Sequence, residues 1–93
     1  MPRRFVPQPA GAAPSDLLDA LADCESHRNP RAVSSNGMYF GAFQDTLTTW
    51  HNLGGTGNPI DFPYEVQKDL NSHIAVSRWG SQFPYCARKL GVA

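Results

Sequence analysis

Two cysteines, Cys24 and Cys86, stand near opposite ends of the folded part of a chain that has only 93 residues. A chain of this length forms one domain with a modest hydrophobic core. A disulfide between these cysteines would close a loop of roughly sixty residues and contribute about 4 kcal/mol in the chain-entropy model. Because that gain is comparable to the whole stability of many small domains, we expect one disulfide rather than two buried free thiols. Such a bond implies an oxidising compartment.

The sequence indicates no metal or cofactor site. Zinc ligands usually come in closely spaced pairs, whereas His27, His51 and His73 are scattered along the chain. A Cys–His nucleophile needs supporting residues, and neither cysteine has a recognisable motif around it. We therefore expect no metal and no cofactor.

Charge and hydropathy exclude several classes of partner. Eight basic and eight acidic residues cancel, so no net field attracts nucleic acid or an anionic membrane. No apolar run approaches the ~20 residues that span a bilayer. Residues 1–9 contain two arginines but no continuous apolar stretch, so we do not expect a signal peptide. This expectation conflicts with an oxidising compartment unless the protein leaves the cell by another route.

The composition changes at about residue 15. Residues 1–14 contain four prolines, one glycine and three alanines, and they show neither helical nor strand periodicity. We expect an extended arm over residues 1–14 and a folded domain over residues 15–93. The arm would lie either against a neighbouring protein in a larger assembly or against its own domain.

The periodicity of apolar residues predicts a mainly α domain with three to four helices. Ser15 is a suitable N-cap for a first helix over residues 16–26. A turn at residues 34–37 and an extended segment at residues 38–40 predict a short extended patch. Further helices are predicted over about residues 45–53, over about residues 63–80, with Val66, Leu70, Ile74 and Ser77 on one face, and over about residues 84–90.

Glu25 differs from the other carboxylates of the first predicted helix. At about 100° per residue, the three aspartates of this helix cluster on one side and its apolar residues on the other. Glu25 falls between Leu18 and Leu21, on the apolar stripe. Burial there raises a carboxyl pKa, as a glycosidase acid requires near neutral pH. The alternatives are that Glu25 reaches solvent from the edge of the stripe, or that it pairs with Arg28 or Arg78.

Several short motifs follow one another in order along the domain. They are Cys24-Glu25-Ser26, the run from Gly37 to Gln44, Thr48-Thr49-Trp50, Gly54-Gly55, Gln67, Ile74-Ala75-Val76, Pro84-Tyr85-Cys86 and Leu90-Gly91. Each motif alone is common, but the ordered series resembles the resuscitation-promoting factor domain, a transglycosylase-like module of actinobacteria and their phages. The resemblance covers the chain from about Asp16 to its C-terminus.

This resemblance implies a small, truncated lysozyme-like fold of the α+β kind, in which Cys24 pairs with Cys86. It implies that Glu25, directly after the first cysteine, is the catalytic acid. The implied substrate is peptidoglycan, cleaved at the β-1,4 bond between N-acetylmuramic acid and N-acetylglucosamine.

The resemblance also implies a glycan groove that includes Gln44, Thr49 and Trp50. Tyr39 and Phe40 point to opposite sides of an extended segment, so we expect one of them in the core and the other at the substrate. Trp50 has two interpretations, packing in the core or stacking on a sugar ring. The same two interpretations apply to Trp79.

The chain departs from the family pattern at three places. These departures bear on how the substrate is positioned more than on the catalytic chemistry. The tripeptide His27-Arg28-Asn29 stands where the family commonly has Gly-Gly-Asn. The loop between Gly55 and Gln67 is a few residues short. Arg78 takes the place of an expected groove glutamine.

The mechanism depends on whether a second carboxylate is present. Retaining and inverting glycosidases use two carboxyl groups about 5 Å and about 6.5–9.5 Å apart, respectively. With Glu25 alone, the acetamido group or the 6-hydroxyl of the muramic acid would trap the oxocarbenium-like centre, and Glu25 would then act as base. Hydrolysis by water is the other outcome. The candidates for a second carboxylate, none of them in a matching motif, are Asp45, Asp61, Glu65 and Asp69.

Two functions from different classes follow. The first is a peptidoglycan-cleaving glycosidase, of the muramidase or lytic transglycosylase type, that acts outside the cell at the wall. The second is a phage virion (tail) or cell-wall structural protein that uses the fold for glycan binding or for assembly through its arm. A virion would also reconcile the disulfide with the missing signal peptide. Neither function involves nucleic acid or a membrane.

Overall fold

The computed structural model describes residues 13–93, and residues 1–12, most of the predicted arm, lie outside this part. Five α-helices and two 3-10 helices account for the regular structure of the described residues. In chain order they are α1 (Ser15–Ser26), α2 (Leu47–Asn52), η1 (Pro59–Asp61), α3 (Tyr64–Asn71), η2 (Val76–Arg78), α4 (Trp79–Gln82) and α5 (Pro84–Lys89). The predicted mainly α fold is thereby confirmed. None of these helices is long and apolar enough to cross a membrane.

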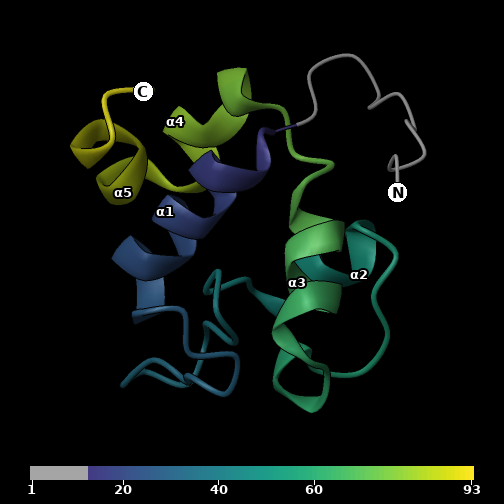
Figure 1. Cartoon of the computed structure of the whole chain (residues 1–93). Helices are drawn as coiled ribbons and strands as arrows, with labels where there is room; N and C mark the ends of the chain where they lie inside the picture. The colour runs from purple at the N-terminus through teal and green to yellow at the C-terminus, as the bar shows by residue number, and fades with distance from the viewer. Residues whose placement is uncertain (1–12) are drawn as a thin grey trace, which may run out of the picture.

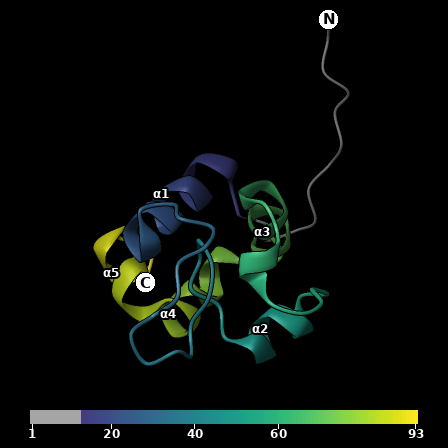
Figure 2. The ribbon, with the colours of Figure 1, turned by 90° about the horizontal axis from the view of Figure 1, so that it is seen from below.

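The helices form two groups. Helices α1, α4 and α5 lie together, α2 and α3 lie beside them, and the chain between α1 and α2 loops below (Figure 1). The view from below shows the same division (Figure 2). The apolar core joins the first group to the segment before α2, and its largest members are Leu18, Leu21, Phe43, Trp79 and Phe83.

The predicted disulfide between Cys24 and Cys86 is confirmed and joins α1 to α5, with 5.9 Å between the two Cα atoms. Cys86 is only 3% exposed and lies in the core. Because the bond links the last turn of α1 to the first turns of α5, it fixes the residues next to both cysteines relative to one another.

Helix α1 follows the predicted periodicity, and its buried residues are Leu18, Leu21 and Ala22. Its start differs from the prediction by one residue. Pro14, not Ser15, is the N-cap, because the Pro14 carbonyl accepts the first helical hydrogen bond, from Leu18 N–H at 3.0 Å. A proline has no side-chain acceptor, and no side-chain cap is present at this end.

The other end of α1 places two non-glycine residues in the left-handed region. His27 has a φ of 58° and Arg28 a φ of 61°. Their N–H groups donate to Asp23 O at 2.9 Å and to Ala22 O at 3.1 Å, which closes the helix. A left-handed backbone costs a non-glycine residue about 1–2 kcal/mol. These are the two positions at which the resembled family commonly has glycine.

The predicted single helix over about residues 63–80 is wrong. Helix α3 ends at Asn71, and the chain continues through η2 into α4. The face that α3 buries is also not the predicted apolar one, because Gln67 and Asn71 are buried whereas Val66 is 38% exposed. Two polar side chains occupy the interior here because each has hydrogen-bond partners there.

Gln67 ties α3 to two connecting segments, one between α1 and α2 and one between α2 and α3. Its Oε1 accepts a hydrogen bond of 2.8 Å from Ala42 N–H. Its Nε2 lies 2.8–2.9 Å from the carbonyl oxygens of Pro30, Pro59 and Phe62. The chain between α1 and α2, which has little regular structure, is therefore held in place from α3.

The short extended patch is confirmed as two isolated bridges, Val33 with Phe40 and Phe40 with Asp45. Helix α2 then begins at Leu47, two residues later than predicted, because the Thr46 side chain is its N-cap and accepts from Thr49 N–H.

Candidate active site

A hollow of about 280 Å³ opens at the C-terminal end of α1. The last turn of α1, the extended patch, the segment before α2 and the junction of α4 with α5 surround it. Its lining residues are Glu25, Tyr39, Gln44, Gln82, Phe83, Pro84 and Tyr85. Three of the residues singled out in the sequence, Glu25, Tyr39 and Gln44, are thus brought together.

Glu25 is half-buried in the last turn of α1. Burial raises the pKa of its carboxyl to about 7, and the negative charge of Asp45 adds to the rise. Among residues 13–93 neither Arg28 nor Arg78 forms an ion pair with it; Arg28 contacts Asp19 instead, at 3.7 Å. A carboxyl of this kind retains its proton near neutral pH and can donate it to a molecule in the hollow.

Asp45 is the second carboxylate of this region. It follows Gln44, is only 1% exposed, and accepts a hydrogen bond of 2.8 Å from Asn71 Nδ2 at its Oδ2. Burial raises its pKa to about 6, although the hydrogen bond from Asn71 opposes the rise. Asp45 does not line the hollow, so its charge acts on Glu25 from behind the surface. The other three candidate carboxylates, which are exposed, are Asp61, Glu65 and Asp69.

Gln44 and Tyr39 also line the hollow. Gln44 has a φ of 52°, and its Nε2 donates to Gly41 O at 2.9 Å, so its amide is held by the preceding turn. Tyr39 is 42% exposed. Phe40 is half-buried and does not line the hollow. Of the two neighbours, Tyr39 is therefore the one available to a bound molecule.

Thr49 and Trp50 do not line the Glu25 hollow. Thr49 lies at its margin, where its Oγ1 accepts a hydrogen bond of 3.3 Å from Gln82 Nε2. Trp50 is fully buried, and its indole N–H donates to Thr56 O at 3.0 Å. Trp79 is also fully buried and donates to Ile74 O. Both tryptophans therefore pack in the interior, which favours the first of the two interpretations given for each, packing in the core.

Sequence reasoning missed the residues contributed by the α4–α5 junction. Tyr85 is 65% exposed at the rim of the hollow, and Gln82 lies at the side toward Thr49. One signal was present: Glu25 follows Cys24 and Tyr85 precedes Cys86, so the disulfide itself brings Tyr85 toward the acid. Gln82 had no such signal, because it falls between the two helices predicted over about residues 63–80 and 84–90.

No group of three or more histidine, cysteine, aspartate or glutamate side chains that could hold a metal occurs within residues 13–93. The polar groups that line the hollow belong to Glu25, the amides of Gln44 and Gln82, and the two tyrosines.

Comparison with known proteins identifies the family of the chain. Residues 12–86 match the family described as Transglycosylase-like domain. The chain is 36% identical over 89 residues to Resuscitation-promoting factor Rpf of Micrococcus luteus, an alignment that covers 90% of this chain and 37% of that protein. It is 35% identical over 83 residues to Resuscitation-promoting factor RpfC of Mycobacterium tuberculosis (strain Erdman), with 89% of this chain and 59% of that protein covered.

A third relative is Resuscitation-promoting factor Rpf1 of Corynebacterium glutamicum, 34% identical over 90 residues, with 89% of this chain and 44% of that protein covered. The chain spans 37–59% of the length of these three relatives. No solved structure matches it significantly. Since the family match and the alignments to these relatives extend over most of its length, the chain belongs to the transglycosylase-like domain family, in agreement with its resemblance to the resuscitation-promoting factor domain.

Proposed function

We propose that this chain cleaves the glycan strands of peptidoglycan, at the β-1,4 bond between N-acetylmuramic acid and N-acetylglucosamine, with Glu25 as the catalytic acid. The observation that carries the proposal is the Glu25 carboxyl, which is half-buried, has a pKa raised to about 7, and lines an open hollow beside Tyr39 and Gln44. Membership of the transglycosylase-like family and similarity to resuscitation-promoting factors support it. The disulfide fits an enzyme that acts outside the cytoplasm, at the cell wall.

In this proposal Glu25 protonates the glycosidic oxygen as the bond to the muramic acid breaks. Asp45 is buried behind the hollow rather than in it, which argues against a second carboxylate as nucleophile or base. The oxocarbenium-like centre is then trapped by a group of the substrate, its acetamido or 6-hydroxyl, or by water. Glu25, now ionised, accepts the proton of the 6-hydroxyl or of the attacking water; where the acetamido group attacks first, this is the water that later opens the ring. The Gln44 amide and the Tyr39 ring would position the sugars on either side of the bond.

Digestion of purified actinobacterial cell walls, followed by mass spectrometry of the released muropeptides, tests the proposal. Trapping by the 6-hydroxyl gives an anhydro product, which is lighter by one water than a hydrolysed one. Glu25→Gln keeps the shape of the side chain but removes the transferable proton, so cleavage should fall by about 10²–10⁴-fold. The chain has one other glutamate, Glu65, which is exposed on α3. Glu65→Gln is therefore the matched control.

Equal digestion by the parent and by Glu25→Gln would show that Glu25 is not the acid. If neither protein digests the walls but both bind them, the chain is a glycan-binding or assembly protein of a wall or a virion, which is the alternative function that its sequence allows.

A further inference from the structure

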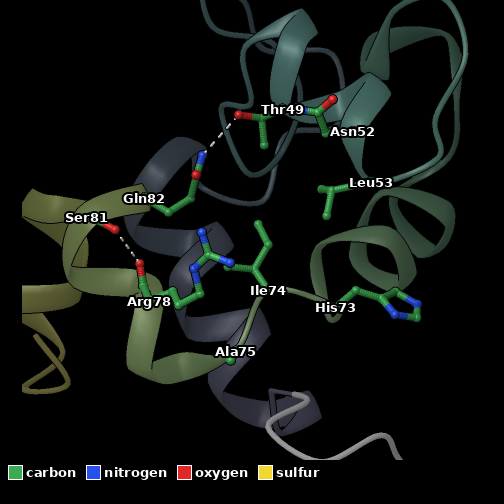
Figure 3. Close-up of a pocket in the computed structure, with 9 residues that line it drawn as sticks. All are labelled: Thr49, Asn52, Leu53, His73, Ile74, Ala75, Arg78, Ser81 and Gln82. Carbon is green, nitrogen blue, oxygen red and sulfur yellow. Dashed lines mark hydrogen bonds between the residues drawn. The ribbon is translucent and has the colours of Figure 1, made fainter.

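A second, larger hollow of about 440 Å³ lies between α2 and residues 73–82 (Figure 3). Gln82 lines both this hollow and the one that contains Glu25. At the boundary its amide Nε2 donates to Thr49 Oγ1 at 3.3 Å, a contact drawn as a dashed line in Figure 3. Gln82 is therefore the residue that the two hollows share.

Arg78 supplies positive charge to this second hollow. Figure 3 shows its guanidinium pointing into the space between Gln82 and Ile74. Arg78 is exposed, and both ion pairs of the described residues are made to Asp19, so its guanidinium has no carboxylate partner within residues 13–93. No aspartate or glutamate lines this hollow. One side of this hollow is thus positively charged, and the Thr49 hydroxyl and the Gln82 amide lie at its boundary with the Glu25 hollow.

We infer that the second hollow is an anionic subsite in which Arg78 binds a carboxylate carried by the branch on the muramic acid, while Glu25 acts on the neighbouring glycosidic bond. This inference rests on the proposed function and names the part of the substrate that the larger hollow recognises. The guanidinium group presents several N–H donors in a planar fork that matches a carboxylate. A neutral amide at the same position would offer a hydrogen bond but no charge.

The chemistry of the substrate supplies such a group. The two acetylated sugars of peptidoglycan are uncharged, and the negative charge sits on the lactyl branch of the muramic acid. Where the stem peptide is absent, the lactyl carboxylate is free; where it is present, the charge is on carboxylates of the peptide. Both sources offer the same ligand to Arg78, so they are separated by experiment.

The test measures binding in a Glu25→Gln background, so that no probe is consumed. Isothermal titration would use three probes: disaccharide units that carry their stem peptide, glycan fragments stripped of peptide by an amidase, and chitotetraose, which is uncharged. Arg78→Gln should weaken binding of the carboxylate-bearing probe about tenfold, the effect of one charged hydrogen-bonded contact. Binding of chitotetraose should not change. Arg78→Lys should recover part of the affinity, because it keeps the charge and loses the fork.

The control is Arg88→Gln, which removes an exposed arginine of α5 that lines neither hollow. Loss of affinity for the stripped fragments assigns the free lactyl carboxylate as ligand, and loss only for the peptide-bearing units assigns the stem peptide. Either result supports the subsite. It is overturned if Arg78→Gln leaves all three probes unaffected, if it weakens chitotetraose equally, or if no carboxylate-bearing probe binds. Arg78-dependent binding without wall cleavage by the parent would contradict the proposed catalysis and leave the subsite standing.

Discussion

Asn71 Nδ2 donates a hydrogen bond of 2.8 Å to Asp45 Oδ2, and both side chains are sealed from solvent in the interior beneath the candidate active site. The remaining oxygens of the pair, Asp45 Oδ1 and Asn71 Oδ1, have no hydrogen-bond partner among residues 13–93. An ionised carboxylate is costly to bury with one such bond, which is why burial raises the pKa of Asp45 to about 6. The protonated Asp45 side chain suits this site better than the ionised one. It is neutral, and its hydroxyl adds a hydrogen-bond donor to a site where the buried acceptor Asn71 Oδ1 has no donor among residues 13–93.

Asp45→Asn is predicted to lower the pH at which wall cleavage is lost on the alkaline side. The charge of Asp45 raises the pKa of Glu25, so removing it lowers that pKa and Glu25 loses its proton earlier as pH rises. The shift should be partial, because burial is the larger cause of the raised Glu25 pKa. Profiles of kcat/KM between about pH 4 and pH 9 measure it. Asp61→Asn, at an exposed carboxylate, is the control, and coincident profiles for Asp45→Asn and the parent would contradict the coupling.

The stability of the protein should fall as pH rises from about 4 to about 7. The folded-state pKa of Asp45 is raised from 3.8 to about 6, and that of Glu25 from 4.5 to about 7. A raised pKa means that the folded state holds the proton more tightly, so the stabilisation is fully present below the unfolded pKa and lost as pH passes the folded one. Asp19 has the opposite sign, because its hydrogen bond from Tyr64 lowers its pKa. The stabilisation that Asp19 contributes is lost as the pH falls through its lowered pKa.

Denaturant unfolding at a series of pH values measures this dependence. For Asp45 alone the free energy of unfolding should change on the order of 3 kcal/mol over the window, at 1.36 kcal/mol per unit of pKa. Asp45→Asn should remove that part of the slope and leave most of the part due to Glu25, because burial is the larger cause of the raised Glu25 pKa. A slope that is unchanged in Asp45→Asn would show that Asp45 is ionised in the folded state throughout.

The position of Glu25 was predictable because it depends on one helix. The periodicity of residues 16–26 placed Glu25 between Leu18 and Leu21, and its half-burial follows from that face. Asp45 was not predictable in the same way. Its burial depends on Asn71, which approaches from α3, and no local pattern in a single sequence reports such a contact.

The break after α3 was missed for a related reason. Apolar residues recur at helical spacing from Val66 to Ile74, but the buried face is set by Gln67 and Asn71, whose partners lie in distant loops and at Asp45. Polar residues count against burial in a periodicity argument, whereas their tertiary hydrogen bonds favour it here. Helix α3 is therefore rotated about its own axis relative to the predicted orientation, and it ends at Asn71.

His27→Gly is predicted to raise the free energy of unfolding by about 1 kcal/mol. His27 has a φ of 58° at the end of α1, a region that glycine enters without strain. The gain is reduced because glycine also gains freedom in the unfolded chain. Arg28 is a less suitable site although its φ is 61°, because it also contacts Asp19 and lies over the Tyr64 ring. Thermal and denaturant unfolding of His27→Gly measure the effect, and a loss of stability would mean that the His27 side chain makes a contribution not visible in its contacts.

Reduction of the Cys24–Cys86 bond should both lower the stability of the protein and disrupt the geometry of the candidate active site. The bond closes a loop with a sequence separation of 62 residues, worth about 4 kcal/mol in the chain-entropy model. It also fixes Glu25, next to Cys24, relative to Tyr85, next to Cys86, across the hollow. We therefore expect a lower Tm and lost wall cleavage in reductant. The double variant Cys24→Ser/Cys86→Ser should reproduce both effects without reductant and should not respond to it. A parent protein whose Tm is the same with and without reductant would show that the core of α1, α4 and α5 holds the site without the bond.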